Sequence, residues 1–238
     1  LSAGAEQASA VHADRRRPLG VLMEVDGARQ VGYNVRAYGA AGDGSNDDHP
    51  AFQKAHDQAL AASGGTKARI FVPEPDPQQS YLLGERWLIT GSSFEVVGSG
   101  KYNCRISNHP DFDDSTYEAL IQIGDGGGGA GSGTSSVVFR RFNVDGRGRE
   151  VSALKMFYWY SANVENCTLR AGTYNDSGLG RETAGLHVRA GKNLFVRECQ
   201  IASSGGHGLL VDDRGDTGNN FSDNLKLREC LITENVGN

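Results

Sequence analysis

The chain has 238 residues, which is enough for one or two domains with a buried core. Its 33 glycines and a hydrophobic content of only 38% argue against a helical bundle. The net charge of -5 argues against a nucleic-acid-binding protein, because proteins of that class concentrate Lys and Arg on one face. No apolar stretch approaches the roughly 18 residues of a membrane span.

Residues 1–31 precede the first regular pattern in the chain. The apolar run Val21–Val25, followed by an Asp26–Gly27 turn, predicts a short element that turns back on itself. We interpret residues 1–31 as a separate leader that serves in oligomerisation or attachment. The next segment, Asn34–Tyr38, is strand-like.

A short amphipathic helix is predicted after this strand. Asp47 or Asp48 can cap its N-terminus, Pro50 lies in its first turn, and Gly64–Gly65 ends it. Its apolar face consists of Phe52, Ala55, Ala59 and Leu60. A helix of this kind suits the open end of a stacked sheet, which otherwise exposes unpaired backbone and apolar interior.

Four eight-residue segments of the second half share apolar residues at their first, third, sixth and eighth positions. They are residues 137–144, 162–169, 194–201 and 225–232. Alternation with a period of two predicts a strand with one buried face, and the shift of phase in the middle predicts a bend between two short strands. The chain is therefore expected to turn a corner once in every repeat.

A second repeated strand has apolar ends and an outward middle residue, in Leu154–Met156, Leu186–Val188 and Leu209–Val211. The connections from Val144 to Leu154 and from Ile201 to Leu209 are too short for a crossover helix. The fold is therefore predicted to be all-β, a parallel β-helix in which one chain winds as a solenoid behind an N-terminal capping helix.

The cysteines follow the same repeat. Cys167, Cys199 and Cys230 are spaced by 32 and 31 residues and occupy the sixth position of three segments. Stacked side chains of this kind point in the same direction, so that their Cβ vectors do not converge on a disulfide. We expect free, buried thiols, and the sequence has no spacing typical of a metal site or cofactor.

Three stretches carry a resemblance to a known family: YNVRAYGAAGDGSNDD from Tyr33, GGTKARIFVPEP from Gly64 and FEVVGSG from Phe94. They resemble the start of the pectate-lyase-3 superfamily of right-handed parallel β-helices, which includes phage tailspike depolymerases, mannuronan epimerases and relatives of polygalacturonases. The resemblance covers roughly residues 32–238, which we take as the β-helix domain. One departure is the proline-rich loop Pro73–Ser80, which is longer than the Pro-Gly turn usual in the family.

The resemblance implies a polysaccharide-binding protein whose full-length parent degrades polysaccharide by hydrolysis or elimination. It also implies a homotrimer on a virion tail or a secreted, extracellular location. The alternative is a non-catalytic structural or adhesive β-helix of a virion or cell surface. The opening motif is specific for the fold and says little about the reaction.

Outward polar residues near the repeated strand form the candidate site. Asp212, Asp213 and His187 are the candidate catalytic groups, because glycan cleavage generally uses carboxylates or an acid and base pair. The candidate substrate-binding residues are Arg189, Lys155 and His207. The alternative is an ordinary solenoid surface, in which outward polar residues are the norm.

Comparison with family patterns favours caution about the reaction. In polygalacturonase relatives an Asp-Asp pair precedes Gly-His-Gly, whereas here Gly206–Gly208 precedes Asp212. The segment Gly185–Ala190 lies where the epimerases have Asp-Pro-His-Glu, and only Asp212 matches a catalytic carboxylate, so epimerase activity is not expected. The charged residues at the corner, from Arg140 to Glu229, are read as structural ladders, and Gly124–Gly133 as a flexible loop.

The end of the chain resembles the middle of the repeat. The step from Ile201 to Leu209 is eight residues, and the same step from Ile232 passes Asn238. We therefore expect further coils in the parent polypeptide, with part or all of the active site among them; a partner subunit that caps this end is the alternative.

Overall fold

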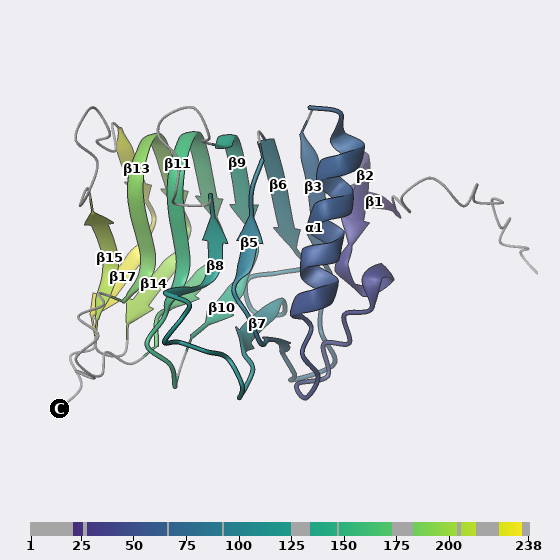
Figure 1. Ribbon diagram of the computed structural model, residues 1–238. Helices are drawn as coiled ribbons and strands as arrows, with labels where there is room; N and C mark the ends of the chain where they lie inside the picture. Colours follow the sequence, from purple (N-terminus) through teal and green to yellow (C-terminus); the bar gives the residue numbers. More distant parts are fainter. Residues whose placement is uncertain are drawn as a thin grey trace, which may run out of the picture.

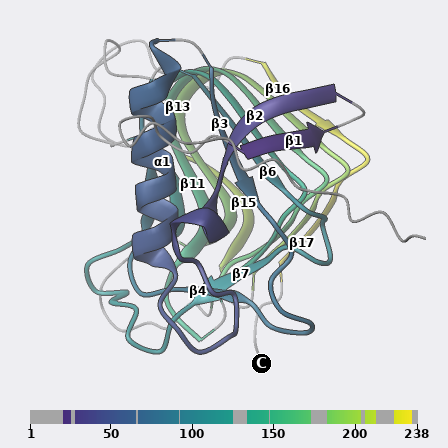
Figure 2. The same ribbon diagram turned by 90° about the vertical axis from the view of Figure 1, so that its right-hand side faces the viewer.

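The computed structural model describes residues 21–25, 28–65, 67–91, 93–124, 134–146, 148–172, 183–203, 206–212 and 224–234. The strands of successive coils lie side by side along one axis, and almost all of them pair in parallel (Figure 1). Viewed along that axis, the coils enclose a single core (Figure 2). The predicted right-handed parallel β-helix is confirmed.

Each coil passes through three sheets, here named in the order in which the chain visits them. The first sheet contains β5 (Trp87–Ile89), β8 (Ala119–Ile123), the N-terminal halves of β11 (Ser152–Glu165) and β13 (Ala184–Arg197), and β15 (His207–Asp212). The second contains β2 (Ala28–Asn34), β3 (Ala68–Val72), β6 (Ser93–Gly98), β9 (Thr134–Arg140), the C-terminal halves of β11 and β13, and β16 (Leu225–Arg228). The third contains β4 (Tyr81–Leu83), β7 (Arg105–Asn108), β10 (Asn143–Asp145), β12 (Thr168–Arg170), β14 (Gln200–Ser203) and β17 (Leu231–Glu234).

The repeat read from the sequence is the register of the sheets. Ala162 pairs with Val137 and Leu194, and Leu194 pairs with Leu225. The inward residues of the first three segments are at most 2% exposed. In the fourth segment Leu227 is 44% and Ile232 37% exposed, because no described strand pairs with the far side of β16 or β17.

The segment Asn34–Tyr38 was expected to be a strand, and this prediction is wrong beyond its first residue. Val35–Tyr38 forms a 3-10 helix, η1, after β2 ends at Asn34. The Asn34 side chain accepts a hydrogen bond from the Arg36 N–H at 2.9 Å, which closes the turn against an extended path.

The predicted capping helix is α1 (His49–Ser63), which lies beside β2, β3 and β5 at the N-terminal end of the stack (Figure 1). Phe52 is fully buried and meets the ring of Trp87 edge-on, with 4.9 Å between ring centroids. His56 is also buried, and its Nε2 lies 3.0 Å from O and 3.1 Å from N of Thr90, directly after β5. The helix therefore supplies a polar partner to the exposed edge of the sheet.

The two aspartates before α1 bind the surrounding loops. Asp48 is the N-cap residue by position, yet its side chain makes no capping bond to the helix and accepts instead from Ala41 N at 2.6 Å and Leu82 N at 3.2 Å. Burial raises the pKa of this carboxyl, against the effect of these backbone hydrogen bonds. Asp47 accepts from His49 N at 2.9 Å and Gly84 N at 2.7 Å. The two aspartates that end the stretch YNVRAYGAAGDGSNDD thus have a structural role, which explains why this stretch is specific for the fold.

The start of the described chain is a hairpin. β1 (Val21–Val25) pairs antiparallel with β2, and the end of β2 joins the second sheet through Tyr33 and Asn34. The division between residues 31 and 32 falls inside β2, and a separate leader stays a prediction.

Candidate functional site

Five residues of successive coils form one row across the outer face of the first sheet. They are Leu88, Gln122, Lys155, His187 and Leu210, each in register with the next. Neighbouring strands of a sheet lie about 4.8 Å apart, so that the Lys155 and His187 side chains are direct neighbours. Each of the two is only 4% exposed.

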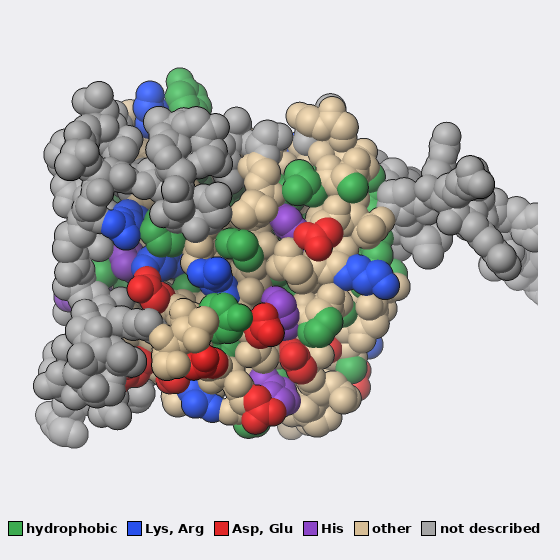
Figure 3. Space-filling view, in the orientation of Figure 1, with side chains coloured by type: hydrophobic (Ala, Val, Ile, Leu, Met, Phe, Trp, Pro, Cys, Tyr) green, Lys and Arg blue, Asp and Glu red, His purple; other side chains and the backbone are tan. Residues whose placement is uncertain are grey.

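Several groups surround this pair. The Lys155 ammonium forms an ion pair with Glu118 and lies 5.0 Å from the centroid of the Phe157 ring. On the next row the Arg189 guanidinium lies 5.9 Å from the same ring. Figure 3 shows the Lys, Arg, His and acidic side chains gathered on this face, over β8, β11 and β13.

Two coils before Lys155, Arg86 precedes β5 and adds a further cation beside the row. Its Nη1 donates to Gln122 Oε1 at 2.6 Å, and Gln122 Nε2 donates to the Gly124 carbonyl at 2.7 Å. The guanidinium lies 5.5 Å from the centroid of the Tyr117 ring. We call Arg86, Glu118, Lys155, His187 and Arg189 the first-sheet cluster.

The predicted site residues are thus only partly brought together. Lys155, His187 and Arg189 are neighbours, and the backbone of Asp212 pairs with that of Arg189. The side chain of Asp212 and all of Asp213 lie outside the described residues. His207 pairs with Ala184, three residues before Leu210 and therefore about 10 Å along the strand from the row of His187. The catalytic and binding roles remain predictions.

Sequence reasoning missed Glu118, Arg86 and Gln122. Gln122 could have been found, because Ile121 and Ile123 give its strand the same apolar frame as Lys155 has in β11. Glu118 and Arg86 precede their strands, at positions that the repeat does not specify.

The cluster has the chemistry of an anion-binding site. Arg86, Lys155 and Arg189 supply three cations, of which Lys155 forms an ion pair with Glu118, and His187 adds an imidazole beside Lys155. Among the described residues, no group of three or more His, Cys, Asp or Glu side chains could hold a metal ion.

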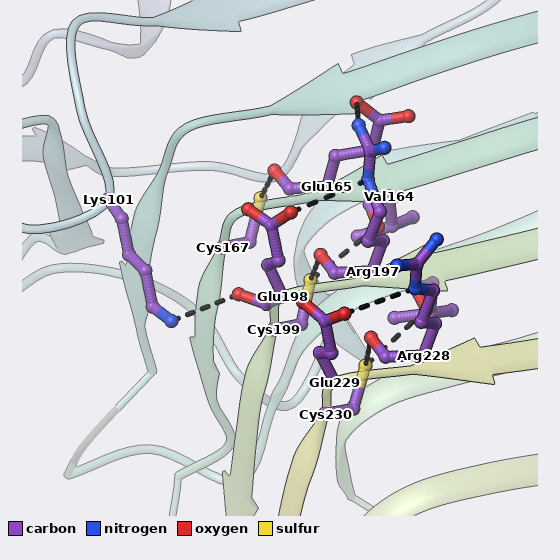
Figure 4. Close-up of polar contacts among 11 residues, drawn as sticks. Lys101, Val164, Glu165, Cys167, Arg197, Glu198, Cys199, Arg228, Glu229 and Cys230 are labelled. Atoms are coloured by element: carbon purple, nitrogen blue, oxygen red, sulfur yellow. Dashed lines mark hydrogen bonds and ion pairs between the residues drawn. The ribbon is translucent and has the colours of Figure 1, made fainter.

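The corner between the second and third sheets is a structural device. Arg141, Asn166, Glu198 and Glu229 occupy equivalent positions there, and all four have φ between 51° and 70°. Left-handed backbone at one residue turns the strand without a longer loop. The charges beside the bend pair with one another, as in Arg197 to Glu165 at 3.1 Å (Figure 4).

The cysteines line the inner side of this corner. Cys167 Sγ lies 3.2 Å from the Glu165 carbonyl and Cys199 Sγ 3.2 Å from the Arg197 carbonyl, with the thiols in one column (Figure 4). Cys167, Cys199 and Cys230 are free, as predicted, although Cys230 is only partly buried, and Cys104 is free as well. Burial raises the pKa of Cys104 to about 12, which keeps that thiol protonated.

Comparison with known proteins agrees with this architecture. The preneck appendage protein of Bacillus phage PZA is 23% identical over 225 residues, which cover 90% of this chain and 21% of that protein. Mannuronan C5-epimerase AlgE3 of Azotobacter vinelandii is 56% identical over 190 residues, which cover 76% of this chain and 10% of that protein. PfbA, a surface adhesin of Streptococcus pneumoniae, has a TM-score of 0.59 at 17% identity, over 84% of this chain and 49% of that one.

This chain spans about a fifth of the phage protein and about a tenth of the epimerase. The likeness to PfbA concerns the fold alone. No helix among the described residues is long and apolar enough to cross a membrane. The family model described as "Rhamnogalacturonase A/epimerase, pectate lyase-like" matches residues 32–228, and the chain belongs to that family.

Proposed function

We propose that this chain is the polysaccharide-binding β-helix of a phage virion appendage, and that the first-sheet cluster binds an acidic glycan. The observation that carries the proposal is the pairing of Lys155 with His187 in one row, with Arg86 and Arg189 beside it. Charge-assisted hydrogen bonds from such groups are the usual means of holding a sugar carboxylate. The family and the name of the mannuronan epimerase support acidic sugars as ligands, and the phage relative supports a virion location.

We further propose that the full-length parent cleaves the glycan that it binds. His187 would transfer a proton at the scissile linkage, and Asp212 and Asp213 would supply the carboxylates that either hydrolysis or elimination requires. Lys155, Arg189 and His207 would bind the substrate. The register of Arg189 with Asp212 supports this arrangement, because it places the backbone of Asp212 beside that of Arg189 in the cluster.

The second candidate is a non-catalytic adhesive β-helix. Lys155 and His187 are each only 4% exposed, and Lys155 is already paired with Glu118, so that the cluster can also be read as packing between coils. The fold shared with a surface adhesin is compatible with this function.

Titration calorimetry with oligogalacturonate and oligomannuronate tests the binding function. We expect Lys155→Gln and His187→Gln each to weaken binding by about tenfold, the loss typical of one charge-assisted hydrogen bond. Lys54→Gln, at an exposed position of α1, is the matched control and should bind as the wild type does. Equal affinity of all four proteins would contradict the proposal.

Product analysis of the same incubations separates the two candidates. New reducing ends indicate a hydrolase, absorbance of unsaturated uronates indicates a lyase, and altered sugar configuration in proton NMR indicates an epimerase. Binding without any product supports the adhesive β-helix.

We also propose a homotrimer, as in tailspike-like β-helices. Light scattering on the full-length parent should return three times the chain mass, and a monomer mass would contradict this assembly.

A further inference from the structure

The third sheet carries a polar groove that the proposed function does not use. It encloses about 420 Å³, and its polar lining consists of Gln78, Ser80, Arg105, Ser107, Asn143, Asp145 and Arg170. The groove lies on a different sheet from the first-sheet cluster. None of these residues was singled out as functional from the sequence.

Two outward rows of successive coils form the floor of the groove. Arg105 pairs in register with Asn143, and Ser107 with Asp145, which in turn pairs with Arg170. The rows are two residues apart along each strand, or about 6.6 Å, and coils are about 4.8 Å apart. This spacing distributes charged, amide and hydroxyl groups over an area comparable to one sugar ring.

The proline-rich loop that departs from the family pattern forms the wall. Arg36 Nη2 donates to Asp76 Oδ1 at 3.0 Å and to the Glu74 carbonyl at 3.2 Å, and Asp76 N donates to the Gly42 carbonyl at 2.9 Å. These bonds hold the loop that carries Gln78 and Ser80. Gln78 has φ of 64°, a conformation that costs free energy for a residue other than glycine and that is often found at functional sites.

The two arginines of the groove differ in their pairing. Arg170 lies 3.5 Å from Asp145, whereas Arg105 pairs with no carboxylate of the described residues and is exposed. Its Nε donates to the Tyr102 carbonyl at 3.3 Å and its Nη1 to the Gln78 carbonyl at 3.4 Å. Two neutral acceptors orient the guanidinium while its positive charge remains unpaired, which preorganises it for an anion.

We propose that this groove is a second glycan site, which binds a single carboxylate-bearing sugar. Arg105 binds the sugar carboxylate, and Asn143 and Asp145 bind its hydroxyl groups. The choice of an acidic sugar rests on the proposed function, while the site itself rests on the geometry of the third sheet. With sites on two faces, one appendage can hold a polysaccharide chain while the first-sheet cluster acts on another part of it.

Titration calorimetry with trigalacturonate, and maltotriose as the neutral probe, tests the second site. The background is the double variant Lys155→Gln with His187→Gln, which weakens the first-sheet site. We expect the binding of trigalacturonate that remains to fall by about tenfold on adding Arg105→Gln, and to be unchanged on adding Arg228→Gln, an exposed arginine of the second sheet. Ser80→Trp, which fills the groove without removing a charge, should reduce the same binding.

The outcomes separate the two proposals. If Arg105→Gln leaves the residual affinity unchanged, the proposal of a second site is contradicted, regardless of the affinities of the first-sheet variants. If the first-sheet double variant binds as the wild type does and Arg105→Gln abolishes binding, the second site stands and the first-sheet site is wrong. Absence of trigalacturonate binding in every protein, with native circular dichroism, overturns both.

Discussion

Apolar side chains are buried at the N-terminal end of the described stack and are partly exposed at its other end. At the N-terminal end, Phe52 of α1 and Trp87 of β5 are fully buried against each other. In the last described coil, Leu227 and Ile232 are 44% and 37% exposed although they occupy inward positions of the repeat. The burial of an inward side chain in a solenoid therefore depends on the coil that stacks on it, and an apolar residue type alone does not bury it.

One column of the second sheet shows the gradient directly. Val164, Val196 and Leu227 are equivalent by register, and their exposures are 0%, 1% and 44%. The contribution of an apolar side chain to stability should follow this gradient, because the free energy of burial scales with the area removed from water.

The largest difference is expected for two phenylalanines. Phe52→Ala should lower the free energy of unfolding by about 3–5 kcal/mol, because it leaves a cavity between α1 and the first coil. Phe195→Ala is the matched control, since that ring is 40% exposed, and should cost less than about 1 kcal/mol. Urea denaturation measures both, and equal losses would contradict the idea that α1 closes the core.

Leucines in the stack and in the last described coil sharpen the comparison. Leu186→Ala should cost about 2–5 kcal/mol, because this side chain is fully buried within the first sheet. Leu227→Ala should cost less than about 1 kcal/mol. If urea denaturation shows a large loss for Leu227→Ala, another part of the molecule covers the last described coil in solution.

A smaller effect should appear at alkaline pH. Burial raises the pKa of Cys104 from 9.0 to about 12, so that only the unfolded chain loses this proton as the pH rises above 9. The stabilisation is complete below pH 9 and is lost as the pH rises towards 12, by at most about 1.4 kcal/mol per pH unit. In Cys104→Ala, the free energies of unfolding at pH 9 and pH 11 should differ less than they do in the wild type. Cys230→Ala, which retains Cys104, should keep the decline.

The sequence predicts the strands well because the repeat records a physical requirement at every coil. Positions such as Phe139, Cys167 and Leu194 must be apolar to fill the core, and the shift of phase between Val164 and Cys167 marks the bend. The left-handed backbone at the bend is harder to predict from the sequence, since Arg141, Asn166 and Glu198 share no side-chain type. Asn34–Tyr38 was misread because a side-chain hydrogen bond to Arg36 N competes with the strand.

The sites were harder to predict because they combine repeat positions with loop positions. Lys155 and His187 follow from the register, whereas Glu118 precedes β8 at a position for which the repeat specifies no residue type. In the third-sheet groove, Asn143 occupies the seventh, outward position of its repeat segment, whereas Asp145 and Arg170 lie beyond the eight-residue segments. Its wall comes from a loop whose path depends on Arg36, far away in the sequence.

The near-constant spacing of Cys167, Cys199 and Cys230 makes the two coils between them equivalent layers. Duplicating residues 167–198 would insert one such layer and lengthen the solenoid by about 4.8 Å. Because the coils are evenly spaced, a surface group on one coil lies at a fixed axial distance from a group on any other coil. The number of coils between two glycan-binding groups therefore sets the distance between them along the solenoid axis.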